Sequence, residues 1–314
     1  MSLQTHRQNI WWVTVVALLV VGCAPAQPVE DESVTQQDEK LDEGIWHVET
    51  GERLTADELI DQLEAAQFIV VGESHGQMWH HEVQNRIHRE LSERAGDQVA
   101  VGMEMFERRF QPALGAYIAG DIDEDEMLQR VEWEKRWGFD KEYYASIWRR
   151  ARQFEQPLIG LNATRELVRQ VGEVGLEGLD EKDREALPDI DLDNREYRRV
   201  LREVFEAHPG GDDDEAFERF YEAQLVWDET MAETAFEYME IAESMERMLV
   251  LAGRGHVQRG HGIPSRLVRR GADPKRVVTV IPVSTQGEAA EQMKEYRHLR
   301  FLRDEQISDV VWIQ

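Results

Sequence analysis

The chain has 314 residues, and its 63 acidic and 36 basic side chains give a formal net charge of −27. Self-repulsion of this size disfavours nucleic acid and anionic membrane surfaces as partners, because both carry the same sign of charge. The length allows one large domain or two small ones, and the single cysteine, Cys23, excludes an intramolecular disulfide.

The first 22 residues have the pattern of a signal peptide. Residues 10–21 are almost wholly apolar and follow Arg7, and this run is too short to span a membrane as a helix. It leads into Val20-Val21-Gly22-Cys23, which resembles a bacterial lipobox, so we expect cleavage before Cys23 and lipidation of its thiol. The alternative is an ordinary signal peptide with an incidental cysteine. Ala24 at the next position is typical of lipoproteins exported to the outer membrane of Gram-negative bacteria.

Residues 23–44 are rich in acidic and polar side chains and nearly lack large apolar ones, which predicts a flexible tether. The globular part is expected to run from residue 45 to residue 314 as one domain. It opens with a helix at residues 55–66, where Thr55 is the N-cap and Glu58 is its capping-box partner.

Apolar runs separated by helix-like segments recur along this domain. The runs that we predict to be strands are residues 67–71, 99–103, 157–161, 248–252, 277–283 and 310–313. Continuous apolar strands that alternate with helices indicate an α/β fold with a mostly parallel sheet flanked by helices. The long interval between the third and fourth runs, at about residues 165–247, is predicted to be an inserted helical cap over the sheet edge.

Two short motifs follow predicted strands from opposite ends of the domain: Gly72-Glu73-Ser74-His75 and Gly253-Arg254-Gly255-His256. Each places an imidazole at the carboxyl edge of the sheet, where open α/β sheets bind ligands. Histidine acts as a base, an acid or a metal ligand near neutral pH. Glu104 and Asn162 follow two further strands, so polar groups from four strands are expected to form one composite site.

The helix after the first motif, at residues 79–91, has an apolar stripe that includes His80. We therefore predict that His80 is a ligand or a support of the site, with a packed core histidine as the alternative. His81 and His88 fall on the opposite side of this helix and are expected to be exposed to solvent.

In a later helix, at residues 214–246, Gln224 and Asp228 interrupt an apolar stripe one turn apart. A carboxylate on a buried face is costly unless it is paired or hydrogen-bonded, so Asp228 should meet a cation, a metal or a histidine. Arg254 and His256 are the expected partners, and Trp227 is expected to form an apolar wall. A purely structural ion pair is the alternative.

Aromatic residues gather between the second and third predicted strands: Trp133, Trp137, Phe139, Tyr143, Tyr144 and Trp148. They either belong to the core or line a flat apolar ligand surface, on which Tyr143 or Tyr144 would be an iron ligand in a haem site. The sequence lacks a Gly-x-Ser-x-Gly elbow, a P-loop, a Gly-x-Gly-x-x-Gly motif after a strand and a His-Glu-x-x-His motif. These absences argue against the common serine-nucleophile, nucleotide-binding and zinc-protease classes.

The paired Gly-x-x-His motifs resemble those of the Tiki/TraB/erythromycin-esterase superfamily, and most of all its ChaN group of haem-binding lipoproteins. The similarity continues at residues 102–106, at Gln111-Pro112, at residues 160–163 and at Gln224 with Trp227-Asp228. It covers nearly all of residues 45–285. The lipobox fits as well, since the group is typified by lipoproteins.

This resemblance implies a parallel α/β core with a helical cap, binding of haem or another small apolar ligand, and a homodimer that stacks two haems. It also implies an iron or haem uptake lipoprotein anchored through Cys23 in the cell envelope. The superfamily's site positions correspond to Glu73, His75, Glu104, Arg254 and His256. The residues expected to contact the cofactor are His75, His80, Tyr143, Tyr144, Trp227, Asp228 and His256.

The same superfamily contains hydrolases, which supply the alternative function. His75 and His256, with the carboxylates of Glu73, Glu104 and Asp228, would then hold a divalent metal ion that activates water. A second form of this hypothesis has His75 act as a general base without a metal. In the esterases two residues separate the glutamate from the histidine, whereas one separates Glu73 from His75, which argues against direct transfer of the esterase mechanism.

Overall fold

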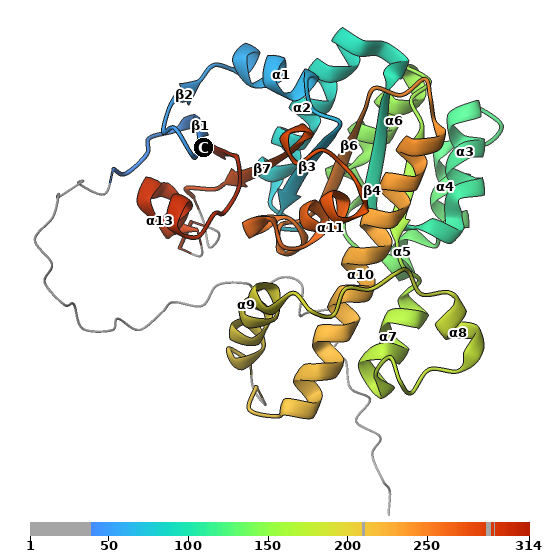
Figure 1. The fold of residues 1–314 in the computed structure, drawn as a ribbon. Helices are drawn as coiled ribbons and strands as arrows, with labels where there is room; N and C mark the ends of the chain where they lie inside the picture. The colour runs from blue at the N-terminus through green and yellow to red at the C-terminus, as the bar shows by residue number, and fades with distance from the viewer. Residues whose placement is uncertain (1–38, 209–210, 287–289, 292) are drawn as a thin grey trace, which may run out of the picture.

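The computed structural model describes residues 39–208, 211–286, 290–291 and 293–314 (Figure 1). The predicted signal peptide, Cys23 and most of the predicted tether lie outside the described residues. Leu41 is buried, and its N–H donates to the carbonyl oxygen of Arg297 at 2.7 Å. The packed domain therefore begins a few residues before residue 45, and the predicted tether extends too far.

The strands of the described residues form a single sheet. Their bounds are Gly44–His47 (β1), Arg53–Leu54 (β2), Phe68–Glu73 (β3), Val99–Glu107 (β4), Leu158–Asn162 (β5), Arg247–Gly253 (β6), Val277–Val283 (β7) and Val310–Ile313 (β8). Their order is β2-β1-β8-β7-β3-β6-β4-β5; β1 is antiparallel to β2 and β8, and the other neighbours are parallel. The predicted mostly parallel sheet is confirmed. β1 and β2 escaped prediction because they are short and carry too few apolar residues to form a run.

Strands β3, β4 and β6 extend further than the apolar runs predict. β3 pairs with β6 as far as Glu73, which lies opposite Gly253, and β4 continues past Glu104 to Glu107. An apolar run ends at the first polar side chain, whereas the pairing of β3 continues to Glu73, and that of β4 resumes at Glu107 after an irregularity in register that includes Glu104. The carboxylates of Glu73 and Glu104 are therefore held by strand backbone rather than by loops.

Helices cover both faces of the sheet. Their bounds are Ala56–Glu64 (α1), Met78–Ala95 (α2), Gln111–Ala119 (α3), Glu124–Arg130 (α4), Trp133–Arg136 (α5), Ala145–Gln153 (α6), Arg165–Val174 (α7), Glu181–Glu185 (α8), Arg195–Glu206 (α9), Asp214–Ile241 (α10), Ile263–Arg270 (α11) and Leu299–Asp304 (α13). The apolar side chains of α1, α2 and α6 share one core cluster with Ile69 and Val71 of β3. Those of α11, α13 and the second half of α10 share another with Phe68 and Val70, as the alternation of a strand requires. Thr55 caps α1 through the predicted capping box with Glu58.

A second layer consists of α7, α8, α9 and the first half of α10, which lie together to one side of the sheet (Figure 1). Separate apolar clusters join α7 and α9 to α10. The buried carboxylate of Glu229 in α10 accepts the backbone N–H of Asp191 at 3.1 Å and pairs with three arginines of α11: Arg266, Arg269 and Arg270. These pairs tie the second layer to the core. Among the helices that the structure describes, none is long and apolar enough to cross a membrane.

The connections that follow β3 and β6 leave the sheet on opposite faces. β3 leads to α2 on one face, and the neighbouring β6 leads through Arg254–His256 to α11 on the other. Two adjacent parallel strands that diverge in this way form a topological switch point, and open α/β sheets bind ligands at the carboxyl ends of such strands. Both Gly-x-x-His motifs lie at this point.

Candidate functional site

His75 and Glu73 form a buried pair at the carboxyl end of β3. The Nδ1–H of His75 donates to Oε1 of Glu73 at 2.6 Å, and the hydroxyl of Tyr144 donates to the same oxygen at 2.8 Å. The other oxygen, Oε2, lies 3.1 Å from Nδ1 of His81. Burial would raise the pKa of Glu73, but hydrogen bonds from His75 and His81 outweigh it and hold this pKa well below its usual range. Glu73 is therefore an ionised carboxylate that orients His75.

The Nε2 atom of His75 is buried and has no hydrogen-bond partner among the described residues. A Cβ atom at position 253 would lie 3.1 Å from this nitrogen, so Gly253 leaves room that a larger residue would fill. The rings of Trp137 and Phe139 lie 4.8 and 5.4 Å from the His75 ring, centroid to centroid. Burial lowers the pKa of His75, but the hydrogen bond and charge of Glu73 and the charge of Glu104 outweigh it and raise this pKa. One imidazole nitrogen is thus held in place, while the other is buried without a hydrogen-bond partner among the described residues, in a ring that lies beside two aromatic side chains.

A second buried pair, Asp228 of α10 and His256, lies beside the first. Nδ1 of His256 donates to Oδ1 of Asp228 at 2.6 Å, and the hydroxyl of Tyr197 donates to Oδ2 at 2.5 Å. The side-chain amide of Gln224 lies 3.1 Å from the same Nδ1. Burial opposes the charged form of His256, but the charges of Glu104 and Asp228 outweigh it and raise the pKa of His256 to about 9. The prediction that Asp228 meets a histidine is confirmed, and this histidine is an imidazolium at neutral pH.

Glu104 of β4 connects the two pairs. Its Oε2 accepts the N–H of Gly253 at 2.6 Å, and its Oε1 lies 3.6 Å from Nε2 of His256. Asn162, at the end of β5, donates its side-chain amide to the carbonyl oxygen of Glu104 at 3.1 Å. Residues from four neighbouring strands and from α10 therefore meet at one place, as the motifs predict.

His80 of α2 supports the site rather than offering a ligand atom, which is one of the two roles predicted for it. Nδ1 of His80 accepts the N–H of Ser74 at 2.8 Å and its Nε2 lies 3.1 Å from the hydroxyl of Ser284, so neither nitrogen is available to a ligand. Burial, and then the charge of Arg254, lower the pKa of His80 to about 3, so it is a neutral support of the loop that carries His75.

The prediction that His81 and His88 are exposed is wrong, because both are buried. His81 stacks on Tyr143 with ring centroids 4.8 Å apart, and Nε2 of His88 lies 2.7 Å from the side-chain oxygen of Gln156. α2 is covered by the sheet on one side and by the segment around α6 on the other, which a single apolar stripe does not reveal.

The two predicted tyrosine ligands differ in their surroundings. Tyr144 is fully buried and its hydroxyl is committed to Glu73; burial, and then the charge of Glu73, raise its pKa well above the usual range. A phenolate ligand is therefore disfavoured at Tyr144. Tyr143 is half-buried and stacks on His81, and Trp227 is half-buried with its ring 6.1 Å from that of His256.

Arg254 does not provide the partner that was predicted for Asp228. Arg254 is buried near Tyr296 and His80. Its guanidinium carbon lies 6.0 Å from the centroid of the Tyr296 ring, and its charge lowers the pKa of His80.

The metal site predicted for the alternative function combines His75 and His256 with the carboxylates of Glu73, Glu104 and Asp228. In the described part of the chain, no group of three or more histidine, cysteine, aspartate or glutamate side chains is arranged to hold a metal ion. The carboxylates of Glu73 and Asp228 instead accept hydrogen bonds from the Nδ1 atoms of His75 and His256.

Sequence reasoning missed Tyr197, whose hydroxyl supports Asp228 as Tyr144 supports Glu73. Tyr197, Val200 and Leu201 form the buried stripe of α9, so the pattern marks Tyr197 only as a core residue. Its contact with Asp228 depends on how α9 packs against α10 and has no local signal.

A family model described as haem-binding uptake, Tiki superfamily, ChaN matches residues 59–267. No curated protein matches the sequence. Among solved structures, ChaN of Campylobacter jejuni with cofacially bound heme aligns with a TM-score of 0.59 and 18% identity, over 88% of this chain and 96% of its own. An erythromycin esterase mutant in its open conformation aligns with a TM-score of 0.45 and 13% identity, over 77% and 76% of the two chains. The likeness to the first of these structures shows a ChaN-like fold.

Proposed function

The chain belongs to the ChaN family of haem-binding uptake proteins in the Tiki superfamily, and on that premise we propose that it binds haem at the carboxyl edge of its sheet, beside His75. The observation that carries the proposal is the free Nε2 atom of His75, which is buried and unpartnered among the described residues while Glu73 holds Nδ1. A ligating histidine typically donates its other ring N–H to a carboxylate or carbonyl, which fixes the tautomer and raises the basicity of the ligand.

The residues around this nitrogen suit a haem group. Trp137 and Phe139 are half-buried aromatic rings next to His75, and flat apolar side chains favour contact with a porphyrin. Gly253 has no side chain that would crowd Nε2, since a Cβ atom there would lie 3.1 Å from it. Bound haem would supply an iron atom whose properties depend on its axial ligand and on the polarity of the pocket. His75 would hold the iron, Glu73 would orient His75, and Tyr144 would fix Glu73.

We propose further that the protein is a cell-envelope lipoprotein with a role in iron or haem uptake, anchored through a lipid on Cys23. The lipobox-like sequence before Cys23 supports the anchor, and Ala24 supports the outer membrane as its location if the host is Gram-negative. A homodimer that stacks two haems is part of the proposal, since the solved ChaN structure is described as binding heme cofacially.

Haemin titration of the full-length protein, followed by the Soret band, tests the proposal. The wild type should saturate at one haem per chain, and His75→Ala should weaken binding by at least about tenfold because a metal ligand is lost. Iron and a proton compete for Nε2, so the raised pKa of His75 predicts that affinity increases with pH.

The matched control is His47→Ala, which removes a histidine of β1. Strands β8 and β7 separate β1 from β3 in the sheet, so this substitution should leave haemin affinity unchanged. Binding that does not saturate, or that is indifferent to His75→Ala, contradicts the proposal.

Hydrolysis with His75 as a general base is the second candidate function. It is favoured by the hydrogen-bonded chain from Tyr144 through Glu73 to His75, since a base oriented by a carboxylate is the arrangement that such catalysis needs. In that case His75→Ala would abolish ester or peptide hydrolysis and leave haemin affinity unchanged, the opposite of the result expected above.

A further inference from the structure

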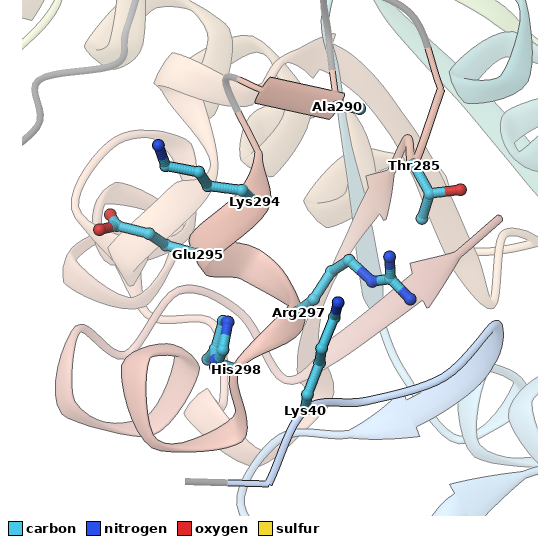
Figure 2. A pocket seen from close by; sticks show the side chains of 7 residues that line it. All are labelled: Lys40, Thr285, Ala290, Lys294, Glu295, Arg297 and His298. Carbon is cyan, nitrogen blue, oxygen red and sulfur yellow. The ribbon is translucent and has the colours of Figure 1, made fainter.

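A pocket of about 360 Å³ lies apart from the histidine site, where the two ends of the described chain meet (Figure 2). Its wall includes Lys40 from the first described residues and Lys294, Arg297 and His298 from the segment before α13. A backbone bridge between Lys40 and His298 and the hydrogen bond from Leu41 N–H to the carbonyl oxygen of Arg297 hold these segments together. The pocket is thus built from residues that are far apart in sequence.

Its charge is opposite to that of the whole protein. In a chain of net charge −27, the described residues that line this pocket include three permanently cationic side chains and one carboxylate, that of Glu295. Lys294 is paired with Glu291 at 2.7 Å. Lys40 and Arg297, by contrast, have no carboxylate within ion-pair distance among the described residues.

Arg297 is half-buried and has few partners among the described residues. Its guanidinium donates one long hydrogen bond, from Nη2 to the carbonyl oxygen of Leu41 at 3.4 Å, and its buried Nε has no partner among the described residues. Arg269 and Arg270, also partly buried, each pair with the carboxylate of Glu229. A partly desolvated cation without a counter-charge is costly, and an anion that enters the pocket would remove that cost.

Figure 2 shows how the side chains are directed. Lys40 and Arg297 extend toward the same side of the pocket, near Thr285, whereas Lys294 and Glu295 extend toward the other side. The hydroxyl of Thr285 donates to the carbonyl oxygen of Gln314, so its proton is committed and the two cations must provide the attraction.

We propose that this pocket binds a phosphate-type oxyanion between Lys40 and Arg297. The planar guanidinium offers paired donors that match the geometry of phosphate, and the lysine adds a second charge. The oxyanion is either a free phosphate or the headgroup of a phospholipid. Lys40 follows Cys23 by 17 residues, which span at most about 60 Å in extended chain, so a lipid on Cys23 would keep this pocket near the membrane. The lipid source therefore rests on the proposed anchor, whereas the oxyanion site does not.

The test uses full-length protein with Cys23→Ser, which removes the proposed lipid attachment, in the wild-type form and with Lys40→Gln, Arg297→Gln or both. Calorimetric titration with inorganic phosphate at low salt probes the free source. Flotation with vesicles of phosphatidylcholine, with and without phosphatidylglycerol, probes the lipid source. Lys182→Gln in α8 is the control, because it removes an exposed lysine outside the pocket.

Phosphate binding that weakens at least about tenfold in the double variant, and not in Lys182→Gln, supports the site with a soluble ligand. Binding only to vesicles that contain phosphatidylglycerol, with the same loss in the double variant, supports it with lipid phosphate as the source. Absence of both kinds of binding, or equal binding by the double variant and the control, overturns the proposal. Haemin titration of the double variant should be unchanged, so this outcome is independent of the proposed haem site.

Discussion

Replacing Asp228 by alanine is expected to lower the free energy of unfolding by about 3–5 kcal/mol, the loss typical of breaking one partner of a buried ion pair. Asp228 is fully buried and accepts hydrogen bonds from His256 and Tyr197. The substitution leaves a buried imidazolium with only Glu104, 3.6 Å from the other ring nitrogen, as counter-charge. It also leaves the buried hydroxyl of Tyr197 without its acceptor. Urea unfolding at pH 7, followed by tryptophan fluorescence, measures the effect.

Glu237→Ala is the control for this substitution. Glu237 belongs to the same helix, α10, but its side chain is exposed, so removing its carboxylate should change the free energy of unfolding by less than about 0.5 kcal/mol. A loss for Asp228→Ala as small as that of the control would mean that the Asp228–His256 pair contributes nothing to the fold.

Stability should fall as the solution is made alkaline. The pKa of His256 is about 9 in the folded protein, against about 6.5 in an unfolded chain. A raised pKa contributes stability that is complete below the unfolded value and is lost as pH rises through the folded value. The free energy of unfolding should therefore decrease by up to about 3 kcal/mol between pH 6.5 and pH 10, and the raised pKa of His75 acts in the same direction.

Acid should also destabilise the protein, for the opposite reason. Burial lowers the pKa of His80 to about 3 and that of His88 to about 4, so below pH 6.5 the unfolded chain takes up protons at these positions before the folded one does. Urea unfolding across this range gives the profile. In His256→Gln the alkaline decrease should become markedly smaller, and an unchanged alkaline slope would contradict the pKa assigned to His256.

The core strands and the two motifs could be predicted from local sequence. A run of apolar residues that ends in glycine and is followed by histidine marks both a buried strand and its functional end, and β3 and β6 are neighbours with Glu73 opposite Gly253. Asp228 could be singled out because a carboxylate on an apolar stripe requires a partner.

The features that were missed depend on tertiary packing. His81 lies off the apolar stripe of α2 and is nevertheless buried, because the aromatic segment around Tyr143 and Tyr144 covers that side of the helix. Tyr197 supports Asp228 only because α9 folds back on α10. The pocket between Lys40 and Arg297 brings together residues from nearly opposite ends of the sequence, so no local sequence pattern could predict it.

The proposed haem site is tested by the position of iron in crystals of the haemin-loaded protein, located from anomalous diffraction at the iron absorption edge. We expect one iron site per chain beside Nε2 of His75, next to Trp137 and Phe139, with Glu73 still accepting the Nδ1–H of His75. An iron site elsewhere on the protein, with His75 free of contact, would contradict it.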